Sequence, residues 1–160
     1  MFCGKPLHFR RACAEVRANL VLFIDVLEHV DDDSALLAHY AAKVARGTRF
    51  LITVPAFQWL WSEHDVFLEH RRRYCIEDLV TAVLKAGLTV LHSSYLLPLA
   101  VATRLPARLH RRRLRPARSQ LRKHGWIANE ALSALCGLEL PMLRFNRLGG
   151  LSVFCLAVKP

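Results

Sequence analysis

Two short, continuous apolar runs constrain the fold of this chain most. They are Asn19–Ile24 (NLVLFI) and Arg49–Val54 (RFLITV), and Pro55 stops the second run. Their short length and their β-branched and aromatic residues are typical of strands that are buried on both faces of a sheet. The pattern therefore predicts two buried parallel strands.

The segment between the two runs has the pattern of an amphipathic helix. Asp31–Asp33 supply an N-cap and acidic groups for a first turn, and Gly47 stands where a glycine commonly ends a helix. Apolar residues recur between them at helical spacing: Leu37, Tyr40, Ala41 and Val44. A helix is therefore expected to connect the two strands.

Strands and helices continue to alternate downstream. Ile76–Ala86 is expected to be a helix closed by Gly87, with Leu79, Val80, Val83 and Leu84 facing inward. The remaining expected elements are strands at Leu88–His92 and Leu151–Val158 and a helix at Trp126–Leu140. This order predicts an α/β fold with a mostly parallel sheet and helices on both faces. Residues 1–160 are treated as one domain, with a core at 19–92, a basic and apolar insertion at 95–125, and a C-terminal helix and strand at 126–160.

The amino-acid composition is that of a folded domain, and most of its excess positive charge lies in one segment. The hydrophobic fraction is 53%, which argues against disorder over most of the chain. Nine basic residues and no acidic residue lie in Arg104–Lys123, and they nearly account for the net charge of +10. This segment indicates either peripheral contact with an anionic membrane or a solvated face. It lacks interleaved aromatic residues, so no specific nucleic acid is expected.

The cysteines and the lengths of the apolar runs indicate in which cellular compartment the protein is expected. The five cysteines are odd in number and form no C-x-x-C pair, which argues against both a disulfide framework and a zinc site. No apolar run reaches the roughly 20 residues of a membrane-spanning helix, and no signal peptide is recognisable. A cytoplasmic location is expected.

The first candidate site follows the first predicted strand as Asp25-Val26-Leu27-Glu28-His29. In a helical turn Asp25 and Glu28 would share a face, with His29 nearby. Such a group can bind a divalent cation or supply a histidine as a general base. A purely structural alternative stays open, in which Asp25 caps a turn while Glu28 and His29 are solvated or hydrogen-bonded locally.

The second candidate site is the stretch Ala56–Tyr74, which is expected to be a long polar and aromatic loop. Long loops in compact domains are commonly functional. The tryptophans can wall a pocket, and the arginines of His70–Tyr74 can bind a carboxylate or a phosphate. The alternative is a packed lid whose arginines pair with Glu63, Asp65 and Glu69.

Both segments resemble motifs of class I S-adenosylmethionine-dependent methyltransferases. LVLFIDVLEHVDDD resembles the fourth strand of that fold and the motif after it, where D-V-L-E-H is common. TVPAFQWLWSEHD and then HRRRY resemble the fifth strand and its loop in one bacterial group, with the pattern V-P-A-x-x-x-L-W-S-x-H-D and H-x-R-R-Y. The resemblance covers residues 19–92. It extends more loosely over 126–158, where Pro141, Gly150 and Ser152 match.

The resemblance implies a small-molecule methyltransferase with S-adenosyl-L-methionine as cofactor and a small molecule as methyl acceptor. It also implies that the last strand is antiparallel and lies at the edge of the sheet. The residues expected to bind the cofactor are Asp25, Val26, Leu27 and His29. The residues expected to bind the substrate are Trp61, His64, His70, Arg72 and Tyr74. The residues expected to be catalytic are His29, His64 and Asp65.

A metal site is not part of this expectation. Ubiquinone-pathway O-methyltransferases carry a related E-x-x-E-H cluster that is associated with a divalent metal, and Asp25, Glu28 and His29 would be its counterpart. The metal question therefore stays open.

The sequence departs from the family at its front end. The family begins with a strand that ends in a glycine-rich loop of the E/D-x-G-x-G-x-G type, and Gly4 is the only glycine before Gly47. The expectation is a truncated methyltransferase domain that binds its cofactor poorly. Two alternatives stay open: a non-catalytic remnant or interaction module that self-associates, and a protein peripheral to a membrane.

Overall fold

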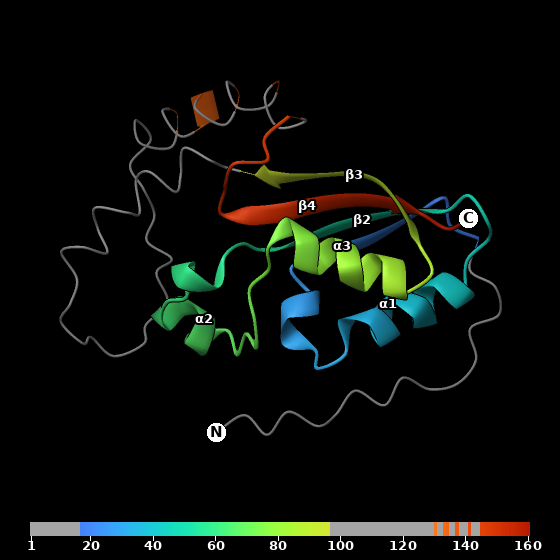
Figure 1. Cartoon of the computed structure of the whole chain (residues 1–160), viewed down its shortest axis with the longest axis horizontal. Helices are drawn as coiled ribbons and strands as arrows, with labels where there is room; N and C mark the ends of the chain where they lie inside the picture. Colours follow the sequence, from blue (N-terminus) through green and yellow to red (C-terminus); the bar gives the residue numbers. More distant parts are fainter. Residues whose placement is uncertain (1–16, 97–129, 131–132, 135–136, 138–140, 142–144) are drawn as a thin grey trace.

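A computed structural model describes residues 17–96, 130, 133–134, 137, 141 and 145–160. Figure 1 shows a single sheet with two longer helices lying side by side against it. The predicted helix at Trp126–Leu140 lies mostly outside the described residues, as does the basic segment Arg104–Lys123. No helix within the described residues is long and apolar enough to cross a membrane.

The sheet has four strands in the order β1-β2-β4-β3. Their bounds are Leu20–Ile24 for β1, Arg49–Pro55 for β2, Thr89–Leu96 for β3 and Ser152–Val158 for β4. β1 and β2 pair in parallel, with Phe23 opposite Ile52. β4 pairs antiparallel with both β2 and β3, so β3 runs in the same direction as β1 and β2. The four predicted strands and the predicted α/β class are confirmed, but the prediction that the first strand is buried on both faces is wrong, because Leu20, Leu22 and Ile24 of β1 are exposed.

The predicted edge position of the last strand is wrong. β4 is inserted between β2 and β3, and β3 lies at the edge of the described sheet. Gly150 leads the chain into this central place: a Cβ atom there would collide with the backbone carbonyl oxygen of Leu96 at the end of β3. The chain therefore needs glycine at this position to bring β4 in beside β3.

The hydrophobic core lies between the sheet and the helices α1 (Asp33–Ala42) and α3 (Ile76–Lys85). Alternate residues of the two central strands are fully buried against these helices: Phe50, Ile52 and Val54 of β2, and Val153, Cys155 and Ala157 of β4. On the opposite face of β1, Leu20, Leu22 and Ile24 are each about half exposed. One face of the sheet is thus covered by the described helices, whereas β1 presents an apolar stripe on the other face.

The ends of the helices follow their capping residues. Asp32 is the N-cap of α1, and its carboxylate accepts a hydrogen bond from the backbone N–H of Ala35 at 2.8 Å. α3 ends at Lys85 with Ala86 as its C-cap, and the predicted closing glycine, Gly87, follows with a φ of +77° and donates its N–H to the carbonyl of Leu84.

Two details of these helices were predicted wrongly. α1 already ends at Ala42, so Gly47 does not end it. Instead, Gly47 lies in the turn before β2 with a φ of +83°. Leu84, which was predicted to face inward on α3, is 56% exposed, because it lies one residue beyond the buried positions of that helix.

The stretch Ala56–Tyr74 is folded, not an irregular loop as predicted. It contains a short 3₁₀ helix, η2 (Gln58–Leu60), and the helix α2 (Glu63–Phe67). Its two ends are joined by backbone hydrogen bonds from Phe57 N–H to the Tyr74 carbonyl and from Tyr74 N–H to the Pro55 carbonyl, both at 2.9 Å. Ala56–Tyr74 therefore leaves the sheet at the C-terminal end of β2 and returns to the same place, and we call this stretch the excursion.

Candidate functional site

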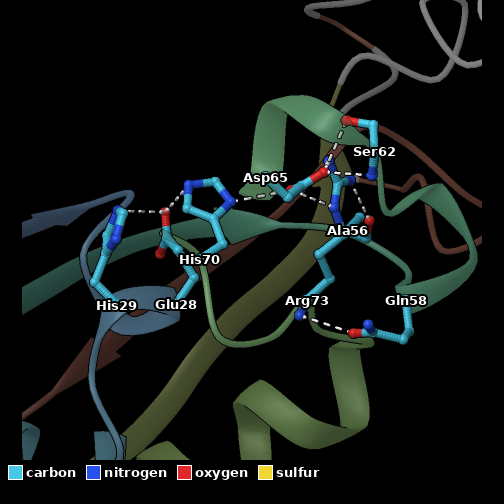
Figure 2. Close-up of polar contacts among 8 residues, drawn as sticks. All are labelled: Glu28, His29, Ala56, Gln58, Ser62, Asp65, His70 and Arg73. Carbon is cyan, nitrogen blue, oxygen red and sulfur yellow. Dashed lines mark hydrogen bonds and ion pairs between the residues drawn. The ribbon is translucent and has the colours of Figure 1, made fainter. Parts of the chain in front are cut away.

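The C-terminal ends of β1 and β2 carry a cluster of buried polar side chains. After β1 the chain turns at Asp25, whose φ of +50° is in the left-handed region, and forms the 3₁₀ helix η1 (Leu27–His29). After β2 it makes the excursion through α2 and returns along residues 70–74. The backbone N–H of Arg71 donates to the carbonyl of Glu28 at 2.8 Å, which joins the two segments. Figure 2 shows the side chains that meet there.

Glu28 is the most unusual member of the cluster. It is fully buried, and neither of its carboxylate oxygens has a hydrogen-bond partner within the described part of the chain. Burial raises the pKa of Glu28 to about 7 although the residue's own backbone N–H opposes it, and of the neighbouring charges Asp25 adds to the rise while Arg73 counteracts it. Buried carboxylates are normally paired or hydrogen-bonded. The bare carboxylate therefore calls for a functional explanation.

Asp65, on α2, is also fully buried but is extensively hydrogen-bonded. It accepts bonds from the backbone N–H and the hydroxyl of Ser62 at 2.7 and 2.8 Å. It also accepts a bidentate pair from Arg73, from Nε at 2.8 Å and from Nη2 at 3.0 Å. Burial raises the pKa of Asp65, but the bonds from Arg73, Ser62 and His70 outweigh this effect and hold it at about 2. Asp65 is thus ionised and anchors α2 to residues 70–74, where the excursion returns to the sheet.

His70 lies between these two carboxylates (Figure 2). Its Nδ1 is 3.0 Å from Asp65 Oδ1, and its Nε2 is 4.0 Å from Glu28 Oε1. His29 approaches from η1, with its Nε2 3.9 Å from the same Glu28 oxygen and its ring 4.7 Å from the His70 ring, edge to face. Partial burial, followed by the proximity of His70, lowers the pKa of His29. A neutral His29 can accept a proton or bind a cation.

Three further residues of the excursion clamp it onto the β1–α1 connection. Arg71 pairs with Asp31 at the surface. Arg72 Nη2 donates to the carbonyls of Asp31 at 2.6 Å and Val30 at 3.3 Å. The buried Tyr74 hydroxyl lies 3.1 Å from the Leu27 carbonyl and 2.9 Å from the carboxylate of Asp33. These contacts fix His70 opposite Glu28.

The structure brings together only part of the predicted site. His29, Asp65 and His70 lie in one cluster. Asp25 and Val26 are exposed at the end of β1, and Asp25 interacts with Thr53 at 3.3 Å, whereas Leu27 is fully buried. Trp61 and His64 lie half-buried on the excursion, and His64 Nδ1 is buried without a hydrogen-bond partner among the described residues. Arg72 and Tyr74 are engaged in the clamp, which favours a positioning role for both.

The geometry also favours a positioning role for Asp65. A carboxylate offers about four lone-pair sites, and Asp65 already receives five donor contacts. A substrate proton would have to displace one of them. The predicted pairing of arginines with Glu63, Asp65 and Glu69 holds only for Asp65, because Arg71 and Arg72 pair with Asp31 and Asp33 instead.

Two residues of the cluster were not among the predicted site residues, namely Glu28 and Arg73. Glu28 was part of the first candidate site in the sequence, as a possible cation ligand with Asp25 or as a locally hydrogen-bonded group, but no cofactor, substrate or catalytic role was assigned to it. The stretch Ser62-Glu63-His64-Asp65 has the spacing of a capping box, which would have indicated that Asp65 is tied to the backbone N–H of Ser62. No pattern in the sequence distinguishes Arg73 from its two arginine neighbours.

Comparison with known proteins gives matches among solved structures alone. No protein-family model matches the sequence, and no curated protein matches it. A chain from the complex between the Haloferax volcanii Trm112 methyltransferase activator and a candidate methyltransferase matches with a TM-score of 0.51. Its sequence identity is 17%, and the match covers 92% of this chain and 56% of that chain.

Two further solved structures are similar. Phosphoethanolamine N-methyltransferase 2 of Haemonchus contortus, in complex with S-adenosyl-L-methionine, has a TM-score of 0.49 and 17% identity over 89% of this chain and 33% of its own. A SAM-dependent methyltransferase from Archaeoglobus fulgidus has a TM-score of 0.48 and 15% identity over 91% and 62%. The chain thus spans less than two thirds of the length of each of these three chains.

The element order, the antiparallel strand inserted beside β2 and the match to the Haloferax volcanii structure agree on the architecture. At these low identities the likeness describes the fold alone. The chain has a class I methyltransferase-like fold.

Proposed function

We propose that this chain is part of an S-adenosylmethionine-dependent methyltransferase that acts on a small molecule. The observation that carries the proposal is the position of the polar cluster. In open α/β sheets, ligands bind beyond the carboxyl ends of the parallel strands, and η1 and α2 lie beyond the ends of β1 and β2. The fold supports the same reaction class.

The end of β1 is the proposed cofactor side. Asp25, Val26, Leu27 and His29 are its candidate contacts, and Asp25, Val26 and His29 are exposed there. Methyl transfer from a sulfonium is an in-line displacement, so the protein mainly has to hold donor and acceptor in line. His29 has a lowered pKa and can take up the proton that an acceptor hydroxyl or amine releases.

The excursion is the proposed substrate side. Trp61, His64 and His70 are candidate contacts, and Arg72 and Tyr74 would hold the segment that presents them. His64 and Asp65 stay candidates for catalysis, His64 for its unpaired buried nitrogen and Asp65 through its bond to His70. A protein partner is also proposed, because the similar Haloferax volcanii structure is a complex with an activator. A cytoplasmic location and peripheral membrane contact through Arg104–Lys123 complete the proposal.

The first prediction concerns the cofactor. We expect residues 1–160 to bind S-adenosyl-L-methionine weakly, because a glycine-rich loop that would let the backbone approach its methionine group is absent from the sequence. Isothermal titration calorimetry measures this affinity. A fusion that places a strand and glycine-rich loop of the family before residue 17 should tighten binding. The same fusion carrying alanine in place of the loop glycines is its matched control.

Two outcomes would contradict these expectations. Tight binding by residues 1–160 alone would contradict the predicted weak affinity and show that the chain holds its cofactor without the loop. A fusion that binds the cofactor but transfers no methyl group to any of a panel of small hydroxyl, amine and carboxylate acceptors, followed by release of S-adenosylhomocysteine, would remove the small-molecule assignment.

The second candidate function is an interaction module without catalysis. The apolar stripe of Leu20, Leu22 and Ile24 on β1 favours it, since β1 is also an edge strand of the described sheet. Open strand edges and exposed apolar stripes promote association. A concentration-dependent mass in analytical ultracentrifugation that Leu22→Lys abolishes would support this alternative, and a monomer at all concentrations would remove it.

A further inference from the structure

Glu28 is energetically costly in the state in which the fold leaves it. A buried carboxylate without a hydrogen bond is unfavourable, and removing it from water costs several kcal/mol unless it is neutralised or paired. Both oxygens of Glu28 lack a partner within the described part of the chain, although two histidines point toward it. The two histidines thus lie near the carboxylate but are too far away to hydrogen-bond to it.

The contacts of His70 determine which of its nitrogens carries the proton. Asp65 Oδ1 lies 3.0 Å from Nδ1, and Asp65 is an acceptor in all its other contacts. In a neutral His70 ring, Nδ1 would therefore carry the proton and Nε2 would present a lone pair toward Glu28. A lone pair facing a carboxylate oxygen across 4.0 Å cannot make a hydrogen bond, but it can share a cation with that oxygen.

The three groups lie slightly farther apart than the ligands of one bound ion. Glu28 Oε1 lies 3.9 Å from His29 Nε2 and 4.0 Å from His70 Nε2. One ligand atom from each of the three residues lies within 4.8 Å of the others. Bonds from zinc to nitrogen and oxygen are about 2.0–2.2 Å, so the ligand atoms of a tetrahedral ion lie about 3.4 Å apart. To hold an ion, Glu28 Oε1 would have to approach each histidine nitrogen by roughly 0.5 Å, and the two histidine nitrogens would have to approach each other by up to about 1.4 Å.

We propose that Glu28, His29 and His70 form a binding site for one divalent transition-metal ion of the Zn²⁺ type. Two imidazoles and one carboxylate are a ligand set of catalytic zinc sites and of other borderline divalent metals, whereas Mg²⁺ and Ca²⁺ prefer oxygen. The ion neutralises the buried carboxylate that nothing else in the described structure neutralises. Asp25, which the sequence suggested as a ligand beside Glu28, is outside the cluster.

The surroundings of the three ligands match those of metal sites that take part in chemistry. Asp65 holds the far nitrogen of His70, as a carboxylate commonly does for a zinc-bound histidine. The His29 side chain is 40% exposed, so the ion would keep an open side toward solvent. Three protein ligands and one open position are the arrangement of a catalytic site rather than of a closed structural one. The metal site does not depend on the proposed methyl transfer.

The test, our second prediction, measures Zn²⁺ and Co²⁺ binding to residues 1–160 by calorimetry, by the visible spectrum of Co²⁺ and by the rise in melting temperature that each metal causes. We compare the wild type with Glu28→Gln and His29→Ala. His39→Ala is the matched control, because His39 is an exposed histidine on α1 outside the cluster. His29 is exposed and Glu28→Gln preserves shape, so both variants should fold.

One ion per chain is expected for the wild type and for His39→Ala, with no thiolate charge-transfer band for Co²⁺. Loss of an outer-shell partner already weakens metal binding roughly 10–100-fold, so loss of a ligand in Glu28→Gln or His29→Ala should weaken it more than about 100-fold. Three results would overturn the site: no saturable binding by the wild type, equal binding by Glu28→Gln, or a loss in His39→Ala as large as in His29→Ala.

Discussion

Asp65 and Glu28 are two fully buried carboxylates on opposite sides of one histidine, and the structure treats them in opposite ways. Asp65 receives donors from Ser62, His70 and Arg73, and its pKa falls to about 2. Glu28 has no hydrogen-bond partner among the described residues, and its pKa rises to about 7. Burial alone therefore says little about the role of an acidic residue.

The difference divides the cluster into a structural half around Asp65 and a reactive half around Glu28. Around Asp65, every donor comes from the excursion itself, so these contacts hold Ala56–Tyr74 together. Around Glu28, the neighbours come from two segments, η1 and the returning chain, and they leave a gap that an ion or a proton can fill. Buried polar groups that lack a hydrogen-bond partner or have a strongly shifted pKa are commonly found at functional sites.

The largest effect should follow from breaking the structural half. Asp65→Ala leaves the buried guanidinium of Arg73 without its carboxylate, and breaking one side of a buried ion pair typically costs about 3–5 kcal/mol. We expect the free energy of unfolding in urea to fall by that amount. Glu63→Ala, which changes an exposed acidic residue two positions before Asp65 on α2, is the control. A loss of less than about 1 kcal/mol in Asp65→Ala would show that the excursion is held by other contacts.

Removing the charge of Glu28 should have the opposite sign. With a folded-state pKa of about 7 against an ordinary 4.5, the folded chain keeps a proton that the unfolded chain releases. This penalty is absent below pH 4.5, grows as the pH rises toward 7 and is complete above it. In a buffer with chelator, Glu28→Gln should therefore be more stable than the wild type by about 1–3 kcal/mol at pH 8, and should not be at pH 4.5.

Unfolding curves for both proteins at the two pH values check this expectation. A Glu28→Gln variant that is less stable than the wild type at pH 8 would mean that the glutamate has a favourable partner after all. The contrast with Asp65 would then disappear.

The smallest effect on stability is expected from a substitution at the exposed rim of the cluster. Arg71 pairs with Asp31 on the surface, where both side chains are largely exposed to solvent. Exposed ion pairs contribute about 0–1 kcal/mol. Arg71→Ala should change the melting temperature little, and less in high salt, whereas Arg73→Ala should lower it strongly. Equal losses would show that the clamp at the surface matters as much as the buried pair.

The course of the chain was largely predictable because its signals are local. The apolar runs placed β1 and β2, Asp32 capped α1, and Gly87 closed α3. The central place of β4 was not predictable from periodicity, since a strand buried between two others and a strand at an edge can have the same apolar run. The early end of α1 likewise depends on how the chain turns toward β2.

The candidate site was predictable in its place and not in its arrangement. The D-V-L-E-H motif correctly located polar groups at the end of β1, but the expectation that Asp25 and Glu28 share a face assumed a regular helical turn. The left-handed φ of Asp25 directs the two carboxylates apart, one to solvent and one to the core. Similarly, three consecutive arginines are chemically equal in the sequence, and only the path of the returning chain decides that Arg73 is the buried one.

The insertion of β4 between β2 and β3 also has a consequence for the order in which the protein can fold. In the described sheet, β2 and β3 are not neighbours and are joined through residues 152–158, which are synthesised long after both. A nascent chain therefore carries β3 unpaired, and one edge of β2 open, until the ribosome has released the last strand. Pairings between such distant segments slow folding and prolong exposure to aggregation. On this basis, chaperone dependence during synthesis should end only when β4 emerges.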